Sequence, residues 1–513
     1  MLRRRTTAAA LLAAAALAAG CSSSPAPRAA APASAPASPP APAAVPPSPT
    51  ATAQAGRTRL AWRSCEGGFE CAELTVPLGA APAAADVRVQ LAVTRLRASG
   101  PGRRVGSLFV NPGGPGASAV EYLQAAYAGL PQVLREHFDL VAFDPRGVGR
   151  STAVRCATTA QLDRLFALDP SPDDVGELDA LEEGSVDLAA GCAQRSGALL
   201  AHVSTAEAAQ DLDRLRAAVG DRRLTYLGYS YGTSIGAAYL DAYPRRVRAM
   251  VLDGALDPAL SWKGLLEGQS RGFDHALDAM LADCERIRCA FRQEVSGSLP
   301  DAYDALAARV DRAPLPGADG RTLGPGEMSL GVGAGLYDRE QGWPVVEQGL
   351  AAAQRGDGRI LLALSDSYLG RSAQGYENIS EANAAVNCLD RPWPRDRAAY
   401  VALADGVRAG SPRFGPAIAL SGLSCVGWPV PATGTPHQVR GAGSPPVVVI
   451  GTTGDPATPY AWSASLARQL DAGVLLTHVG EGHTVFRTGA PACIVDPVDD
   501  YLVSLRRPAQ ARC

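Results

Sequence analysis

A serine lies at the centre of a glycine-flanked pentapeptide, Gly228-Tyr229-Ser230-Tyr231-Gly232. An apolar run, residues 224–227, precedes the pentapeptide, and the small and apolar residues 233–240 follow it. A strand, a sharp turn and a helix with serine at the apex form a nucleophile elbow. Glycine and serine are common in this chain, so the pentapeptide alone is weak evidence. Its strand–turn–helix setting makes Ser230 the candidate nucleophile.

A serine hydroxyl needs a base to take its proton, usually a histidine that a carboxylate orients. After an elbow of this kind the acid and then the histidine follow the serine along the chain. His483 lies in a glycine-flanked loop just past the last predicted strand, whereas His478 at the end of that strand is interpreted as structural. Asp455 ends the preceding strand, and its alternative role is a turn or cap residue. Asp144 precedes the serine and is interpreted as a structural turn residue.

An acyl-transfer site also needs N–H donors for the oxyanion of the tetrahedral intermediate. The backbone N–H of Tyr231, the residue after the serine, is one candidate. The glycine-rich segment 111–118 follows an early strand and is the candidate for the second donor. Its two prolines have no N–H, which leaves Gly113 or Gly114, and Gly114 is preferred. A phosphate-binding loop is the competing interpretation, but the segment lacks the P-loop lysine and the G-x-G-x-x-G spacing.

Alternating strands and helices are expected to position these residues. A capping box, Ser204-x-x-Glu207, predicts a helix that runs to Gly220. Strands are predicted at 87–93, 107–110, 138–143, 224–227, 247–252, 446–450 and 473–477. This order predicts an α/β fold with a mainly parallel sheet covered by helices on both faces. Between 258 and 440 helical patterns dominate, which predicts a mostly helical insertion that forms a cap over the site.

The first residues have the features of an export signal. An arginine cluster is followed by an apolar stretch, residues 8–19, which is too short to span a bilayer. The sequence Leu17-Ala18-Ala19-Gly20-Cys21 resembles a bacterial lipobox, so lipidation of Cys21 and membrane attachment are expected, with plain secretion as the alternative. Residues 22–57, rich in alanine, proline and serine, are expected to form an extended tether. The expected organisation is therefore leader 1–21, tether 22–57, core 58–257, helical cap 258–440 and core 441–513.

Composition narrows the function classes further. The 513 residues are 47% hydrophobic, and the net charge of -3 argues against a general nucleic-acid binder. Apart from Cys21 there are ten cysteines, an even number that is expected to pair in an oxidising compartment. Pairing of nearest neighbours is favoured and gives 65–71, 156–192, 284–289, 388–425 and 493–513. No metal or other cofactor is expected, because the close pairs lack partners at zinc spacing.

Four segments together resemble a known family: residues 111–116, 144–149, 228–232 and 454–459. Residues 387–390 and 482–484 add to the likeness, which covers roughly residues 60 to 513. The chain resembles the secreted tripeptidyl aminopeptidase-like serine peptidases of actinobacteria, α/β-hydrolase proteins related to prolyl aminopeptidases. The resemblance implies Ser230 as nucleophile, Asp455 as acid and His483 as base, beneath a helical cap that restricts access to the peptide's N-terminus. Some members of the family act as esterases or endoproteases.

An aminopeptidase must bind a free α-ammonium group, for which a buried carboxylate is suited. Asp257, Glu381 and Asp390 are candidates, each with a surface or capping role as the alternative, and Asp390 is favoured because Cys388 would anchor its loop. The expected function is an exported serine hydrolase that cleaves short peptides from the free N-terminus through an acyl-enzyme on Ser230. A carboxylesterase or lipase with the same triad is the alternative, and a catalytically silent binding lipoprotein is a third possibility.

Overall fold

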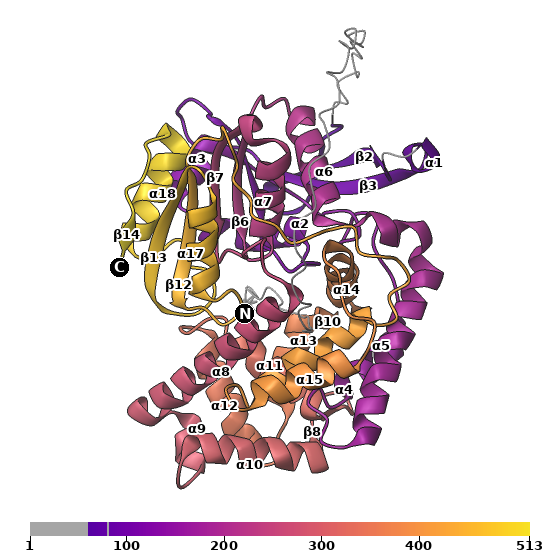
Figure 1. Cartoon of the computed structure of the whole chain (residues 1–513). Helices are drawn as coiled ribbons and strands as arrows, with labels where there is room; N and C mark the ends of the chain where they lie inside the picture. The colour runs from indigo at the N-terminus through magenta and orange to yellow at the C-terminus, as the bar shows by residue number, and fades with distance from the viewer. Residues whose placement is uncertain (1–59, 80–81) are drawn as a thin grey trace, which may run out of the picture.

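The computed structural model describes residues 60–79 and 82–513. Its main sheet has the strand order β1-β2-β3-β5-β4-β6-β7-β12-β13-β14 (Figure 1). The bounds are β1 Arg63–Ser64, β2 Glu70–Pro77, β3 Arg88–Leu96, β4 Gly106–Asn111, β5 Phe138–Phe143, β6 Leu224–Tyr229, β7 Val247–Asp253, β12 Val447–Gly454, β13 Gly473–Glu481 and β14 Ala511–Arg512. Pairing is antiparallel from β1 to β5 and parallel from β5 to β14. The predicted mainly parallel sheet is confirmed.

Burial along the strands explains which of them the sequence revealed. Every residue of β5 and of β6 is buried, as expected for central strands with helices on both faces. In contrast β2 and β3 alternate between buried and exposed residues and form one edge of the sheet. Each of the seven predicted strands is present. The prediction missed β1, β2 and β14, which lie toward the edges, and β1 and β14 are only two residues long.

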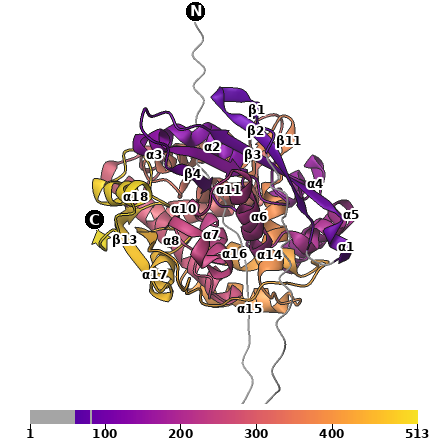
Figure 2. The same cartoon turned by 90° about the horizontal axis from the view of Figure 1, so that it is seen from above.

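Helices cover both faces of the sheet, as predicted. On one face lie α2 (Ala119–Ala126), α3 (Gln132–His137) and α18 (Ala492–Ser504), which share an apolar core with the sheet. The other face carries α6 (Thr205–Ala218), α7 (Gly232–Ala242) and α17 (Tyr460–Gln469). The predicted capping box opens α6. Seen from above, these two sets of helices lie on either side of the strands (Figure 2).

A second, mostly helical layer lies at the carboxyl ends of the parallel strands (Figure 1). Residues 258–440 contribute most of it: α8 (Trp262–Ile287), α9 (Ala290–Glu294), α10 (Leu299–Arg312), α11 (Pro325–Gly335), α12 (Gly342–Gln354), α13 (Arg359–Leu369), α14 (Ile379–Asp390), α15 (Ala398–Arg408) and α16 (Gly415–Leu420). Two small hairpins join it, β8 (Leu315–Pro316) with β9 (Thr322–Leu323), and β10 (Arg371–Ser372) with β11 (Gly375–Tyr376). A short helix, α1 (Pro82–Ala85), lies between β2 and β3.

Two helices from the segment that the sequence assigned to the core also belong to this layer. They are α4 (Thr159–Ala167) and α5 (Val175–Ser196). A β-carbon on Gly326 at the start of α11 would lie 2.1 Å from the carbonyl oxygen of Phe166, so α4 and α11 are in direct contact. Arg397 at the start of α15 pairs with two carboxylates of α5. Helical periodicity shows that a face is buried but not which layer buries it, so the sequence could not assign these helices.

The five predicted disulfides are all present: 65–71, 156–192, 284–289, 388–425 and 493–513. The bond between Cys388 and Cys425 joins α14 to the 3₁₀ turn Ser421–Cys425, so it fastens two parts of the helical layer. Cys21, the leader and the tether lie outside the described residues. Within the described ranges no helix combines the length and apolarity that a membrane span requires.

Candidate active site

Ser230 occupies a sharp turn between β6 and α7. Its φ angle of 52° lies in the left-handed region, which a residue with a side chain rarely adopts. The turn is held because the N–H of Ser230 donates to the carbonyl of Asp253 at 2.9 Å and its own carbonyl accepts from Thr233 at 2.8 Å. A β-carbon on Gly228 would lie 2.6 Å from the carbonyl oxygen of Gly232, which explains why glycines flank the serine. The side chain of Ser230 is 5% exposed and lines a cleft.

Asp455 and His483 form a buried pair beside this turn. Nδ1 of His483 lies 2.9 and 2.8 Å from the two carboxylate oxygens of Asp455. The carboxylate is itself fixed by the N–H groups of Ala457 and Thr458 and by the Thr458 hydroxyl. Asp455 is 3% exposed and His483 7% exposed. The turn role and the pairing role that the sequence offered for Asp455 therefore coexist. His478 lies inside β13 and does not bond to Asp455.

The second nitrogen of the imidazole is free, and the ring lies next to the segment that holds the serine turn. Nε2 of His483 is buried and has no hydrogen-bond partner among the described residues. A β-carbon on Gly254 would lie 3.0 Å from Cε1 of His483, and the residue before Gly254 accepts the hydrogen bond from Ser230. From the helical layer, Tyr337 packs edge-on against the imidazole at 5.2 Å, and its carbonyl accepts the N–H of His483 at 2.7 Å. The helical layer thus takes part in holding the histidine.

Asp253, at the end of β7, links the serine turn to the histidine loop, and the sequence argument missed it. Its carbonyl accepts the N–H of Ser230, and its Oδ2 accepts the N–H groups of Val485 and Phe486 at 2.9 and 2.7 Å. Oδ1 is buried without a partner in the described part of the chain. Burial raises the pKa of Asp253 to about 6. The only feature of the sequence that could have pointed to Asp253 is its place at the end of a buried strand.

The glycine-rich loop after β4 faces the same turn. Gly113 has a φ angle of 106°, and a β-carbon there would lie 2.8 Å from Cβ of Ser230 and 2.9 Å from the nitrogen of Tyr231. The N–H of Gly113 already donates to the Asn111 side chain at 3.0 Å. No described residue accepts a hydrogen bond from the N–H of Gly114 or of Tyr231. Of the two glycines that the sequence offered, Gly114 is therefore the one with a free donor.

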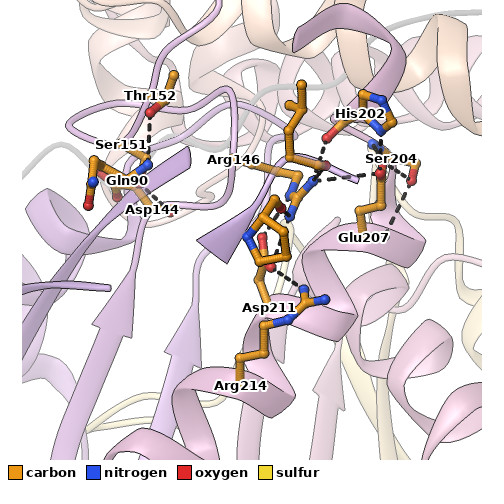
Figure 3. A network of polar contacts seen from close by, with 12 residues as sticks. Gln90, Asp144, Arg146, Ser151, Thr152, His202, Ser204, Glu207, Asp211 and Arg214 are labelled. Atoms are coloured by element: carbon orange, nitrogen blue, oxygen red, sulfur yellow. Dashed lines mark hydrogen bonds and ion pairs between the residues drawn. The ribbon is translucent and has the colours of Figure 1, made fainter. Parts of the chain in front are cut away.

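The loop after β5 holds this region in place (Figure 3). Asp144 accepts from the Ser118 hydroxyl at 2.8 Å and from the N–H of Arg150 at 2.8 Å, so it ties the loop after β5 to the start of α2. The Arg146 guanidinium is 2% exposed and binds both carboxylate oxygens of Asp211 on α6 at 2.7 and 3.0 Å. It also donates to backbone carbonyls, so the buried charges are fully paired. The Asp-Pro-Arg-Gly segment is thus structural.

Asp390 lies in the same cleft as Ser230 but is already hydrogen-bonded. It accepts the N–H of Thr205 at 2.8 Å and also the Thr205 hydroxyl, which lies 2.6 Å from the hydroxyl of Tyr231. Burial raises the pKa of Asp390 to about 6. The other two candidates serve as acceptors in the framework: Glu381 binds the N–H groups of residues 156 and 157, and Asp257 binds the N–H of residue 259 and the side chain of residue 469.

Two cavities meet at the site. The site cleft, about 270 Å³, is lined by Ser230, Gly114, Tyr231, Thr458 and Asp390 among others. A second cavity of about 280 Å³, which we call the apolar chamber, lies within the helical layer, with Leu165, Leu181, Leu330, Ala417 and Ile418 on its wall. Both cavities touch Gln269 and Asn387, and Tyr337 lies between the chamber and His483.

Comparison with known proteins agrees with this geometry. A family model described as "TAP-like protein" matches residues 411–513, and one described as "alpha/beta hydrolase fold" matches residues 106–305. Serine protease Hip1 of Mycobacterium tuberculosis is 39% identical over 87% of this chain and 88% of its own length. Carboxylesterase B of the same organism is 38% identical, covering 86% of each chain. Tripeptidyl aminopeptidase of Streptomyces lividans is 31% identical over 90% of this chain and 87% of that protein. The chain is thus a serine hydrolase that belongs to the α/β-hydrolase family, with the TAP-like serine peptidases.

Proposed function

We propose that the protein is an exported serine exopeptidase in which Ser230, His483 and Asp455 form the catalytic triad. His483 takes the hydroxyl proton through Nε2 as the Ser230 oxygen bonds to the scissile carbonyl carbon. The same proton then goes to the leaving nitrogen as the C–N bond breaks. Water, deprotonated by His483, attacks the resulting ester and releases the acyl part. The observation that carries this proposal is the buried Asp455–His483 pair, whose Nε2 has no partner among the described residues, together with the strained turn at Ser230.

The oxyanion of the intermediate would be held by the N–H groups of Gly114 and Tyr231. Both donors lack an acceptor among the described residues, which supports this assignment, whereas the N–H of Gly113 is occupied by Asn111. Gly113 instead allows its loop to lie against the serine turn, because a β-carbon at this position would collide with Ser230. The donors are fixed before the substrate arrives, so little reorganisation accompanies charge development.

Cleavage from the free N-terminus is the finer part of the proposal. Asp390 lines the site cleft, and its carboxylate is the candidate partner for the substrate ammonium group. A tripeptidyl aminopeptidase among the relatives supports a preference for short peptides. The apolar chamber would take an apolar side chain near the scissile bond, because its wall includes the half-exposed side chains of Leu165, Leu181 and Leu330.

The second candidate function is that of a carboxylesterase with the same triad. The relative named carboxylesterase B is 38% identical to this chain, nearly the same as the 39% of the serine protease relative, and this supports the esterase as an alternative. Ester and amide hydrolysis share the acyl-enzyme chemistry, so the two functions differ in the leaving group that the cleft accepts.

Export with lipidation at Cys21 completes the proposal and rests on the lipobox-like leader.

Labelling and substrate turnover test the proposal together. A fluorophosphonate probe should label the wild-type protein but not Ser230→Ala, while the exposed Ser504→Ala on α18 serves as the labelled control. Tripeptide anilides with a free amine should be cleaved much faster than their N-acetylated forms. Equal cleavage of the two forms, with aryl esters turned over far faster, would favour the esterase. Labelling of Ser230→Ala would contradict the assigned nucleophile.

A further inference from the structure

Arg391 is a cation in the site cleft that forms no ion pair with any described residue. It follows α14 directly and lines the cleft that contains Ser230. Its Nε and Nη1 atoms are buried and have no hydrogen-bond partner among the described residues, and no carboxylate of the described chain forms an ion pair with it. A guanidinium keeps its charge in a protein. The cleft therefore contains a partly buried positive charge that the proposed triad does not use.

The other charged groups that line the cleft have partners. Asp390 binds the N–H and the hydroxyl of Thr205, and Asp241 lies 3.2 Å from Nε2 of His437. Asp390 is adjacent to Arg391 in the chain, yet the two do not form an ion pair. The backbone of Arg391 is extended, with φ at -154° and ψ at 154°, directly after the helix that carries Asp390. The negative charge of Asp390 favours the guanidinium from beyond ion-pair distance, but no side chain of the described cleft forms an ion pair with it.

A buried guanidinium without an ion-pair partner is unfavourable, so such a group favours binding of an anion. The partner that best fits a guanidinium is a carboxylate, which binds it through two parallel hydrogen bonds. We propose that Arg391 binds a carboxylate of the substrate, either an acidic side chain or a free C-terminus. This inference rests on the proposed function, since it requires that the substrate occupies the cleft at Ser230.

The carboxylate would lie close to the scissile bond. Arg391, Tyr231 and Ser230 line the same cleft, which has a volume of about 270 Å³. A cleft of this volume places the anion site within a few residues of the nucleophile. An extended peptide advances about 3.3 Å per residue, so the carboxylate would belong to one of the few residues beside the scissile bond.

The test compares matched substrates that differ only in charge. One set consists of tripeptide anilides with Glu or Gln at each of the three positions. A second set has short peptides with a C-terminal acid or amide, and a third compares the p-nitrophenyl monoester of glutaric acid with its neutral butyrate analogue. For the wild-type enzyme we expect kcat/KM to favour the carboxylate by about tenfold or more in one set, because charge-assisted hydrogen bonds are the strong ones. The set that responds identifies the source of the carboxylate.

Variants then assign this preference to Arg391. Arg391→Met should reduce the ratio to about one, Arg391→Lys should retain part of it, and the exposed Arg408→Met should leave it unchanged. The ratio within one protein does not depend on how much of that protein is folded. If Arg391→Met is inactive, calorimetric binding of the Glu and Gln peptides to Ser230→Ala and to Ser230→Ala/Arg391→Met gives the same comparison without turnover.

Two results would overturn the inference. One is a wild-type enzyme that shows no preference for a carboxylate in any of the three sets. The other is a preference that persists in Arg391→Met. Either result leaves the proposed function intact if fluorophosphonate labelling still depends on Ser230. Loss of that dependence would instead refute the proposed nucleophile, so the two failures are distinguishable.

Discussion

Replacing Asp253 should separate the role of its acceptor oxygen from the role of its charge. Oδ2 accepts both N–H groups of the histidine loop, from Val485 and Phe486, while Oδ1 accepts none within the described chain. Asp253→Asn can keep its carbonyl oxygen in the place of Oδ2 and retain both bonds. Asp253→Ala removes them and leaves two buried donors unsatisfied.

The size of each effect follows from these contacts. An unsatisfied buried donor costs about 1–3 kcal/mol, so Asp253→Ala should lower the free energy of unfolding by about 2–6 kcal/mol. Both substitutions remove the buried charge, and above pH 6 that gain offsets part of the loss in Asp253→Ala. Asp253→Asn should behave differently because it also keeps the acceptor oxygen. The pKa of this carboxyl rises from 3.8 to about 6 on folding. At about 1.4 kcal/mol per pKa unit, the buried carboxylate costs at most about 3 kcal/mol at pH 8.

The sign of the pH dependence follows from the raised pKa. Between pH 4 and 6 the native state holds the proton more tightly than the unfolded chain does, so the contribution of Asp253 to stability falls as pH rises through this range. Below this range Asp253 is protonated in both the native and the unfolded state, so burying it no longer lowers the stability. The stability of Asp253→Asn relative to the wild type should therefore increase from pH 4 to pH 6 and stay constant above it.

Urea denaturation at several pH values between 4 and 8 would give the free energy of unfolding of the wild type, Asp253→Asn and Asp253→Ala. Asp405→Asn, an exposed substitution on α15, is the control for the loss of one carboxylate. Other buried acids titrate as well, so the informative quantity is the difference between variant and wild type at each pH. The reasoning would be refuted if Asp253→Asn lost as much stability as Asp253→Ala at pH 8, or if the difference from the wild type did not change with pH.

Three further perturbations test the site and its support. Asp455→Asn should lower kcat on the order of 10⁴-fold with KM little changed, because the amide favours the wrong tautomer of His483, and steady-state kinetics that show normal kcat would contradict the triad. Arg146→Met should cost about 3–5 kcal/mol in chemical denaturation, since it leaves the Asp211 carboxylate buried without its bidentate partner, and adding Asp211→Leu should restore much of that loss. Ala417→Trp should narrow the apolar chamber and lower kcat/KM for peptides with Phe beside the scissile bond about tenfold relative to Ala, whereas an unchanged ratio would exclude the chamber from substrate binding.

Much of the fold and of the candidate site could be predicted from the sequence because the signals are local. A central strand is recognised by a short apolar run, and the elbow at Ser230 by the glycines that its crowded turn requires. The capping box of α6 needs only the spacing of Ser204 and Glu207. Short loops between neighbouring cysteines favoured the pairing that the structure contains.

Other features depend on contacts between segments far apart in the chain. Asp253 matters because its carboxylate meets backbone groups more than two hundred residues away. The layer to which α4 and α5 belong is set by their neighbours on α11 and α15, not by their own periodicity. The lack of an ion-pair partner for Arg391 in the described part of the chain is a property of its surroundings, which no local pattern reports.

The sequence by itself determined the order of serine, aspartate and histidine and the strands that carry them, because these follow from turn geometry and periodicity. Short spacing only favoured the cysteine pairs, which the structure then confirmed. Only the tertiary structure decided which glycine has a free N–H, which acids are already hydrogen-bonded and which charge lacks a partner. Burial and hydrogen bonding depend on every element that packs around a group. The proposed nucleophile can thus be recognised in the chain, whereas the groups proposed to select a substrate emerge only from the packed cleft.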